Sequence, residues 1–431
     1  MALNITGDMD QNLYRFCGAT PEANLMGIEK IFPDILTTKL TVNYRSTKSI
    51  INATQLLINH NYADHGGPYE ERFRKDLQPR PDAEDGEPVT FAMYPTPETE
   101  AEAVIETVLE ALTHYKPGDI FIGARTRAQL GFLEGPLVRA KIPFINIAGG
   151  SFWASKHVAD VVAYLKLAYD TSDNDSFSRI FNVASNWMVC PWGENKGDYC
   201  SHRYLGRAFL DRVNHSYNNL YYASSEWRFK AGSEDLTDLI YQIQGVLAGA
   251  KNAGEVIRMI MDDCYIKYMR HEDGITSTDE AENGKLQDLE TVFEIATEMD
   301  IPVFIAYVDD CIKAAEAAKE KNLDDYLVLS TIHRLKGQER AVVYGVGFCE
   351  GEDVKTGDPR GLLPHTFSMT PPPQFGILPT GGMGRIEDET CVAFVLISRA
   401  KEICRLFGTA SYRTAKMEPS RFVGWAGIEY E

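Results

Sequence analysis

The chain has 431 residues, with 43 Lys and Arg against 62 Asp and Glu, which gives a formal net charge of −19 at pH 7. This length allows two or three domains, and a composition of 44% hydrophobic and 24% charged residues excludes a disordered or low-complexity chain. The acidic balance excludes a surface that attracts nucleic acid everywhere, so any nucleic-acid site must be a local groove. No apolar run approaches the roughly 18 residues of a membrane helix, and the start shows no leader, so we expect no membrane association and a cytoplasmic setting.

Between residue 38 and about residue 170, short β-branched runs alternate with longer helical ones. We expect strands at 38–42, 88–94, 119–125 and 143–149, and helices at 46–60, from about 98, and at 127–141. Ser46 is in position to cap the first of these helices, and a polar loop covers about 64–86. Strict alternation of strand and helix predicts an α/β fold with a parallel sheet covered by helices.

The middle third, from about 186 to 324, behaves differently. Irregular sequence rich in Trp and Tyr is followed by helical periodicity at 236–264 and 285–299, which predicts a helical domain. Cys190, Cys200 and His202 are the one cluster that suggests a metal. Tetrahedral zinc needs four ligands, usually in two close pairs, and no second pair is present, so we expect no metal site.

After residue 324 the strand character returns. Strands are expected at 326–333 and 341–348, a long surface loop in the Gly- and Pro-rich stretch 351–384, a helix at 393–401 and a strand at 403–408. This order predicts one α/β domain that is interrupted by a helical insertion and completed by the C-terminal strands.

Four short segments are hard to explain by the fold alone. They are GDMDQNLYRFCGA at 7–19, NYRS at 43–46, LSTIHRLKGQE at 329–339 and VLISRAKE at 395–402. Together and in this order, they resemble the third to sixth motifs of superfamily 1 helicases of the UvrD/Rep type. The resemblance covers most of 5–185 and 325–408, so the insertion is supported mainly by its position.

The resemblance implies a RecA-like motor domain, a fold of the P-loop NTPase type, built from 38–185 and 325–431. The mainly helical insertion would be 186–324, and 1–37 would be the last strand and loop of a first motor domain. The implied function is the C-terminal half of an ATP-dependent DNA helicase, with 3′ to 5′ polarity.

The resemblance also assigns residues to ATP. Arg45 and Arg399 match arginines that reach the γ-phosphate, where a forked guanidinium suits the departing charge. Gln11 matches a phosphate-sensing amide, Tyr44 an aromatic that stacks on adenine, and Glu339 a carboxylate that accepts from ribose hydroxyls. The alternative for each arginine is a surface salt bridge at a helix end.

For single-stranded DNA, the resemblance assigns base contacts to Tyr14 and Phe16 and a DNA-facing position to His333. The alternative for the two aromatics is packing into a core. The sequence also departs from the family pattern: Cys17 replaces an arginine, Thr390 and Cys391 replace an arginine pair, and Phe394 replaces a tyrosine.

The sequence contains neither the GxxxxGK[ST] loop that holds phosphates nor an acidic pair for magnesium. We therefore expect ATP with Mg²⁺ as cofactor, with magnesium ligands on a missing half, and little ATP hydrolysis by this chain alone. The expected partners are single-stranded or partly duplex DNA and a polypeptide or N-terminal segment that carries the loop and the acidic pair. Two alternatives remain: a non-catalytic nucleic-acid-binding or regulatory helicase-like subunit, and a protein-interaction module that uses the acidic insertion.

Overall fold

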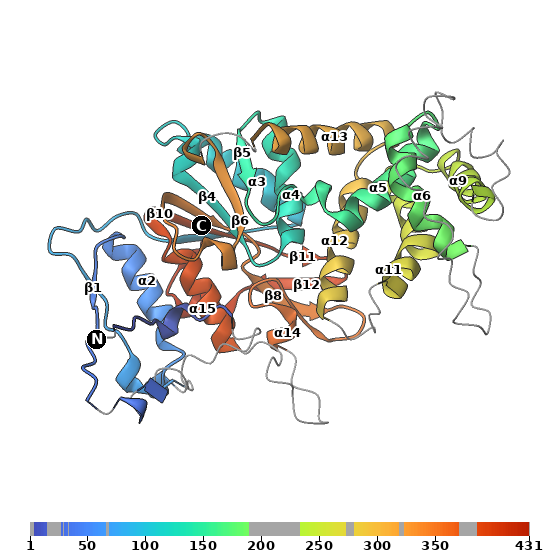
Figure 1. Cartoon of the computed structure of the whole chain (residues 1–431). Coiled ribbons are helices and arrows are strands. Elements are labelled where there is room, and N and C mark those ends of the chain that lie inside the picture. The colour runs from blue at the N-terminus through green and yellow to red at the C-terminus, as the bar shows by residue number, and fades with distance from the viewer. Residues whose placement is uncertain are drawn as a thin grey trace. The chain divides into compact units, whose positions relative to one another are not determined.

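The computed structural model describes residues 4–14, 27–28, 30–32, 34–65, 69–188, 233–272, 280–318, 323–369 and 386–430. The chain divides into two compact units (Figure 1). The first comprises Met1–Gly150 and Ala314–Glu431, and the second comprises Ser151–Lys313.

A seven-stranded parallel sheet forms the centre of the first unit, with the order β13-β3-β10-β7-β4-β6-β5. Its strands are β3 (Thr90–Tyr94), β4 (Ile120–Ala124), β5 (Phe144–Asn146), β6 (Leu327–Thr331), β7 (Arg340–Gly345), β10 (Ala400–Thr409) and β13 (Glu429–Tyr430). All five residues of β4 are buried, and Phe121 in this strand lies opposite Val328 of β6 and Val343 of β7. The predicted α/β class with a parallel sheet is confirmed.

Helices cover both faces of this sheet. On one face α2 (Lys48–Asn59) packs against α15 (Ile386–Ile397), and on the other α3 (Pro97–Ala111) packs against α4 (Arg127–Arg139) (Figure 1). Every residue of α15 from Glu389 to Ile397 is buried, and the part from Val392 to Ile397 accordingly has apolar residues on all sides. The core between α2, α15 and the sheet also includes Met9 and Leu13 from the N-terminal segment.

The start of α2 corrects an expectation. Ser46 does not cap the helix: the N-cap is Thr47, without a side-chain hydrogen bond, and the Ser46 hydroxyl donates to the carbonyl oxygen of Ala400 at 2.7 Å. The turn before α2 is therefore attached to the first residue of β10, and a residue that is a good cap by type serves a tertiary contact instead.

The expected strand at 38–42 is wrong as a member of the large sheet. Only β1 (Val42–Asn43) is extended and paired, and its partner is β2 (Gln78–Pro79) in a separate two-stranded sheet. Leu40 is 77% exposed and Val42 is 42% exposed, so the apolar side chains of this run do not enter the core of the unit.

The stretch 351–384 is also not a loop throughout. Its first part contributes to a four-stranded antiparallel sheet of order β11-β12-β8-β9, followed by α14 (Thr366–Met369). The strands are β8 (Cys349–Asp353), β9 (Pro359–Gly361), β11 (Ser411–Tyr412) and β12 (Ala415–Pro419). Gly351 permits this pairing, because a Cβ at its position would lie 2.0 Å from the carbonyl oxygen of Lys416. Residues 370–385 lie outside the described part of the chain.

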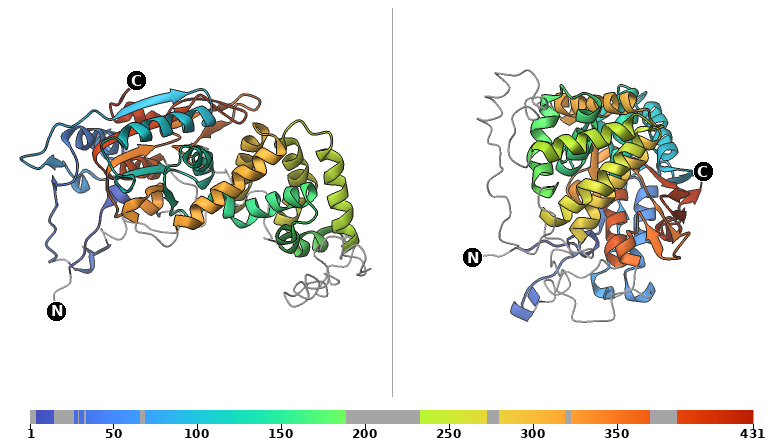
Figure 2. Two further views of the ribbon diagram at one scale, coloured as in Figure 1. Left: turned by 90° about the horizontal axis from the view of Figure 1, so that it is seen from above. Right: turned by 90° about the vertical axis from the view of Figure 1, so that its right-hand side faces the viewer.

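In the described residues of the second unit, the regular elements are helices (teal-green through yellow to orange in Figure 2). They are α5 (Lys156–Tyr169), α6 (Asn174–Met188), α9 (Ser233–Leu247), α10 (Ala253–Met259), a π-helix (Ile260–Tyr265), α11 (Ile266–Glu272), α12 (Glu280–Thr297) and α13 (Ile301–Ala318), whose last residues belong to the first unit. The unit begins at Ser151 and so includes α5 and α6, while the division at 186 and 324 stays a prediction.

A buried carboxylate joins three parts of this unit. Asp160 of α5 accepts from the Arg179 guanidinium and from the Tyr265 hydroxyl, each at 2.7 Å. Cys190, Cys200 and His202 lie outside the described residues. Among the helices of the described ranges, none combines the length and hydropathy that crossing a bilayer requires.

A buried acid on α3 predicts an unusual pH dependence. Glu100 accepts from the backbone N–H of Gly347 at 2.8 Å, and burial raises its pKa from 4.5 to about 7. Between these values the unfolded chain has lost the proton that the folded chain keeps. The free energy of unfolding therefore falls as the pH rises from 4.5 to about 7, by up to about 3 kcal/mol. Glu100→Gln should remove this fall in urea unfolding measured across that range.

The matched control is Glu102→Gln, which changes an exposed residue of the same helix and should keep the wild-type pH profile. A Glu100→Gln variant with an unchanged pH slope would show that Glu100 titrates normally in the folded chain.

Candidate nucleotide and nucleic-acid sites

A pocket of about 500 Å³ in the first unit is lined by segments that are far apart in the sequence. The five residues predicted to face ATP all line it: Gln11, Tyr44, Arg45, Glu339 and Arg399. Glu339 directly precedes β7 and Arg399 directly precedes β10, so the pocket lies at the amino ends of these neighbouring parallel strands.

The turn between β1 and α2 places Arg45. The Asn43 side-chain oxygen accepts from the backbone N–H groups of Arg45 at 2.8 Å and Ser46 at 3.1 Å, an Asx turn that fixes the backbone. The Arg45 guanidinium then donates to the carbonyl oxygen of Ser398 at 2.9 Å and forms an ion pair with Glu339. A surface salt bridge was the alternative role considered for Arg45. Arg45 does form an ion pair, but both Arg45 and Glu339 line the pocket.

Glu339 receives a second cation, because Lys401 Nζ lies 3.1 Å from its other carboxylate oxygen. The hydrogen bond from Arg45 is the main cause that lowers the pKa of Glu339. The carboxylate is therefore ionised at neutral pH and is a strong acceptor for a hydroxyl group.

Arg399 is a buried cation, with only 1% of its surface exposed. Its guanidinium donates to the carbonyl oxygens of Val395 at 3.0 Å and Gln338 at 3.2 Å and to the Ser398 hydroxyl at 3.0 Å. Within the described part of the chain, no carboxylate forms an ion pair with it. Burial and then the nearby Arg45 lower its pKa to about 10, so it stays charged at neutral pH. A charged wall of this kind favours an anionic ligand.

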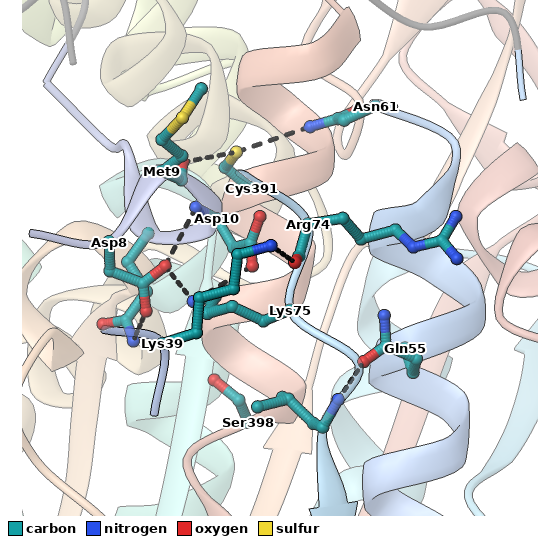
Figure 3. Close-up of polar contacts among 12 residues, drawn as sticks. Asp8, Met9, Asp10, Lys39, Gln55, Asn61, Arg74, Lys75, Cys391 and Ser398 are labelled. Atoms are coloured by element: carbon teal, nitrogen blue, oxygen red, sulfur yellow. Dashed lines mark hydrogen bonds and ion pairs between the residues drawn. The ribbon is translucent and has the colours of Figure 1, made fainter. Parts of the chain in front are cut away.

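Gln11 lies in the short 3-10 turn Met9–Gln11, which the Asp8 side chain caps by accepting from Asp10 N at 3.1 Å. The Gln11 amide donates to the other Asp8 oxygen at 2.8 Å. Lys75 forms ion pairs with Asp8 and, at 3.1 Å, with Asp10 (Figure 3). Asp10 is buried and accepts from the Tyr62 hydroxyl at 2.6 Å, and burial raises its pKa.

Sequence reasoning missed Asp8 and Lys75 as members of this site. Lys75 lies in the polar stretch 64–86, which the sequence predicts to be a loop, and charged residues of surface loops are normally solvated. The one available signal was the pair of acids in GDMDQ, which need a cation if the segment is buried.

Tyr14 and His333 lie together beyond the end of β6. The Tyr14 hydroxyl donates to the His333 carbonyl oxygen at 3.1 Å, and their rings meet edge to face at 6.2 Å. Tyr14 is 41% exposed, whereas the preceding Leu13 is 3% exposed, so Tyr14 points out of the core. Lys336 Nζ lies 6.0 Å from the centre of the Tyr14 ring and supplies positive charge at this surface. Phe16 lies outside the described residues.

His333 is largely buried. Burial, followed by the charge of Arg125, lowers its pKa to about 4, so the imidazole is neutral at neutral pH. The imidazole therefore adds no positive charge to this surface at neutral pH.

The family departures within the described residues, Thr390, Cys391 and Phe394, occupy buried positions. The Cys391 thiol donates to the Met9 carbonyl oxygen at 3.7 Å and accepts from the Asn61 amide at 3.5 Å, and burial raises its pKa. Thr390 donates to the carbonyl oxygen of Ile386 at 2.8 Å, and Phe394 is buried at the pocket wall. The neutral Cys391 side chain therefore joins α15 to Met9 of the N-terminal segment. Cys17 lies outside the described residues.

A parallel sheet with helices on both faces and this pocket define the class of the first unit: it has the RecA-like α/β fold. Residues 38–188 match the family model of the UvrD-like helicase C-terminal domain. The chain is thus related to the C-terminal half of UvrD/Rep-type helicases, as the order of its motifs predicted.

Curated relatives agree with this family. The chain is 27% identical to an "ATP-dependent DNA helicase PcrA" of Leuconostoc citreum, over 98% of this chain and 53% of that protein. It is 25% identical to the protein of that name from Staphylococcus aureus strain MRSA252, again over 98% and 53%. The chain spans about half the length of the curated relatives it matches.

Proposed function

We propose that this chain supplies the second motor half of an ATP-dependent DNA helicase, with 3′ to 5′ polarity. One observation carries the proposal: five residues from four segments, assigned to ATP by motif resemblance alone, line a single pocket. A non-catalytic scaffold has no need to bring these residues together.

Each residue has a role that its surroundings support. Arg399 and Arg45 stabilise the charge on the departing γ-phosphate. Gln11 senses that phosphate, the 73%-exposed ring of Tyr44 stacks on adenine, and Glu339 accepts from ribose hydroxyls. Arg399 is buried and has no ion pair within the described residues, and its charge fits a phosphate group.

ATP acts with Mg²⁺ in this proposal. Of the carboxylates at the pocket, Asp8 and Glu339 are already paired with Lys75 and with Arg45 and Lys401. We therefore assign no magnesium ligand to this chain. A phosphate-loop half, on the same or another polypeptide, would supply both the loop and the metal ligands.

The test is ATP hydrolysis with and without single-stranded DNA, by this chain alone and in a mixture with a polypeptide that carries GxxxxGK[ST] and the acidic pair. That polypeptide is sought in the sequence upstream of the Met1 codon or in neighbouring reading frames. DNA-stimulated hydrolysis is expected in the mixture alone. Equal hydrolysis by the chain without a partner would contradict the need for a second half.

Binding of single-stranded DNA tests the second surface. Tyr14→Ala should weaken binding of a labelled single strand by about fivefold to a hundredfold, because stacking one base is worth about 1–3 kcal/mol. The matched control is Tyr430→Ala, which removes a 60%-exposed tyrosine from β13. Equal affinity of the Tyr14→Ala and wild-type chains would contradict base stacking on Tyr14. Affinity that does not fall with salt would contradict an electrostatic groove at this surface.

The alternative, a non-catalytic nucleic-acid-binding or regulatory subunit, is favoured by the neutral, buried Cys391 at a position where the family has arginine. A chain that binds DNA but gives no hydrolysis with any phosphate-loop partner would support it.

A further inference from the structure

We infer that Lys75 is a positioning residue for the proposed ATPase: it holds Asp8, and Asp8 holds the Gln11 amide at the nucleotide pocket. The inference rests on the proposed function and deepens it, because it adds a residue to which the motif resemblance gave no role.

The contacts form a continuous chain (Figure 3). Lys75 Nζ forms ion pairs with Asp8 and Asp10, and the second Asp8 oxygen accepts from Gln11 Nε2 at 2.8 Å. The Lys75 side chain is 18% exposed and the Asp10 side chain 2% exposed, so solvent screens these pairs only in part. Lys336 also stabilises the Met9–Gln11 turn, because its Nζ donates to the Gln11 carbonyl oxygen at 2.8 Å.

The backbone around Lys75 is held on both sides. Lys39 Nζ donates to the carbonyl oxygen of Arg74 at 2.9 Å, and the backbone N–H of Leu77 donates to the Gln55 side chain at 3.0 Å (Figure 3). Gln55 is in turn oriented by its bond to Asn59 on the same helix, at 2.8 Å. Lys75 therefore extends toward the N-terminal segment from a loop whose backbone is bonded to Gln55 of α2 and to Lys39.

In this proposal Lys75 acts through the carboxylates of Asp8 and Asp10 and does not bind phosphate itself. Its ammonium group already has two acidic partners, and one of them, Asp10, is also fixed by the Tyr62 hydroxyl. Burial alone would lower the pKa of Lys75, but the charges of Asp10 and Asp8 outweigh it and raise the pKa, so the cation persists at neutral pH. The Gln11 amide is in this way kept in one orientation at the pocket wall.

Positioning predicts a particular kinetic effect. Lys75→Met keeps the length of the side chain and removes the charge, and a misplacement of about 1 Å at a reacting site can cost about 100-fold. In the ATPase mixture, kcat should fall roughly tenfold to a hundredfold while KM for ATP changes less than about threefold. Lys75→Arg should recover most of kcat. Lys48→Met, which breaks an exposed ion pair with Asp85, is the control and should behave as wild type.

A double-mutant cycle tests the route through Gln11. In a Gln11→Ala background, Lys75→Met should lower kcat less than about twofold further, because the residue that it positions is gone. A full, additive loss would overturn the inference, as would a rise in KM that accounts for the whole effect.

If the Lys75→Met chain does not fold, Asp8→Ala provides a second test. It breaks the same Lys75–Asp8–Gln11 contacts, and the Asp8 side chain is more exposed than that of Lys75. It should reproduce the fall in kcat, and an unchanged kcat would overturn the inference. Absence of hydrolysis in the wild-type mixture would instead count against the proposed function, so the two failures are distinguishable.

Discussion

Arg399→Ala is expected to lower DNA-stimulated ATP hydrolysis in the two-part mixture by about a thousandfold or more. An arginine that stabilises the transferring phosphoryl group is worth about 10³ to 10⁵ in kcat. Arg399 is held by three hydrogen bonds to uncharged groups, so its charge is available to a ligand in the pocket. The loss should appear mainly in kcat, because Arg399 interacts with negative charge that develops on the phosphoryl group in the transition state. The measurement is steady-state hydrolysis at saturating DNA.

Arg399→Lys should fall between wild type and alanine, because lysine keeps the charge and loses the fork. Arg139→Ala removes an exposed arginine on α4 and is the matched control. Thermal unfolding of each variant separates a catalytic loss from a folding defect. If the alanine variant hydrolyses ATP as fast as wild type in the mixture, Arg399 does not reach the phosphate.

Glu389→Gln is expected to destabilise the first unit by about 3–5 kcal/mol, the range for removing one partner of a buried ion pair. The Glu389 side chain is 2% exposed and binds both Nε and Nη2 of Arg125, at 2.8 to 3.0 Å. It also accepts from the backbone N–H of His365 at 3.0 Å. Without the carboxylate, the partly buried charge of Arg125 loses its ion pair with Glu389. Hydrogen exchange of the α15 and β4 amides measures the local loss directly.

Glu102→Gln is the control for this change, since its 4.0 Å pair with Arg139 is exposed and should be worth less than about 1 kcal/mol. Burial raises the pKa of Glu389, but Arg125 outweighs it and the net pKa is lowered from 4.5. The stability that the pair contributes is therefore present above pH 4.5 and is lost as the pH falls through the folded pKa. A difference from wild type that persists undiminished in strong acid would contradict an ionised Glu389.

The sequence predicted most of the central sheet because its strands carry a strong local signal. The run DIFIGAR contains β4, whose five residues are all buried, and continuous apolar runs of this length are typical of central parallel strands. The run TKLTV at 38–42 also has β-branched residues, but its apolar side chains Leu40 and Val42 are exposed and it joins a different sheet. The local sequence pattern indicates that a segment can form a strand. It does not indicate which other strand that segment pairs with, or in which sheet.

The sequence by itself determined the motifs and their order and predicted which residues face the nucleotide, because each motif is a short run of fixed residue types. Only the tertiary structure decided which charges meet. Arg45 and Glu339 are 294 residues apart, and Lys75 and Asp8 are 67 residues apart. It also decided that Glu100 keeps its proton to about pH 7 and that Arg399 is charged without an acidic partner in the described residues. Both depend on burial and on neighbours from other segments, and local spacing carries no information about either.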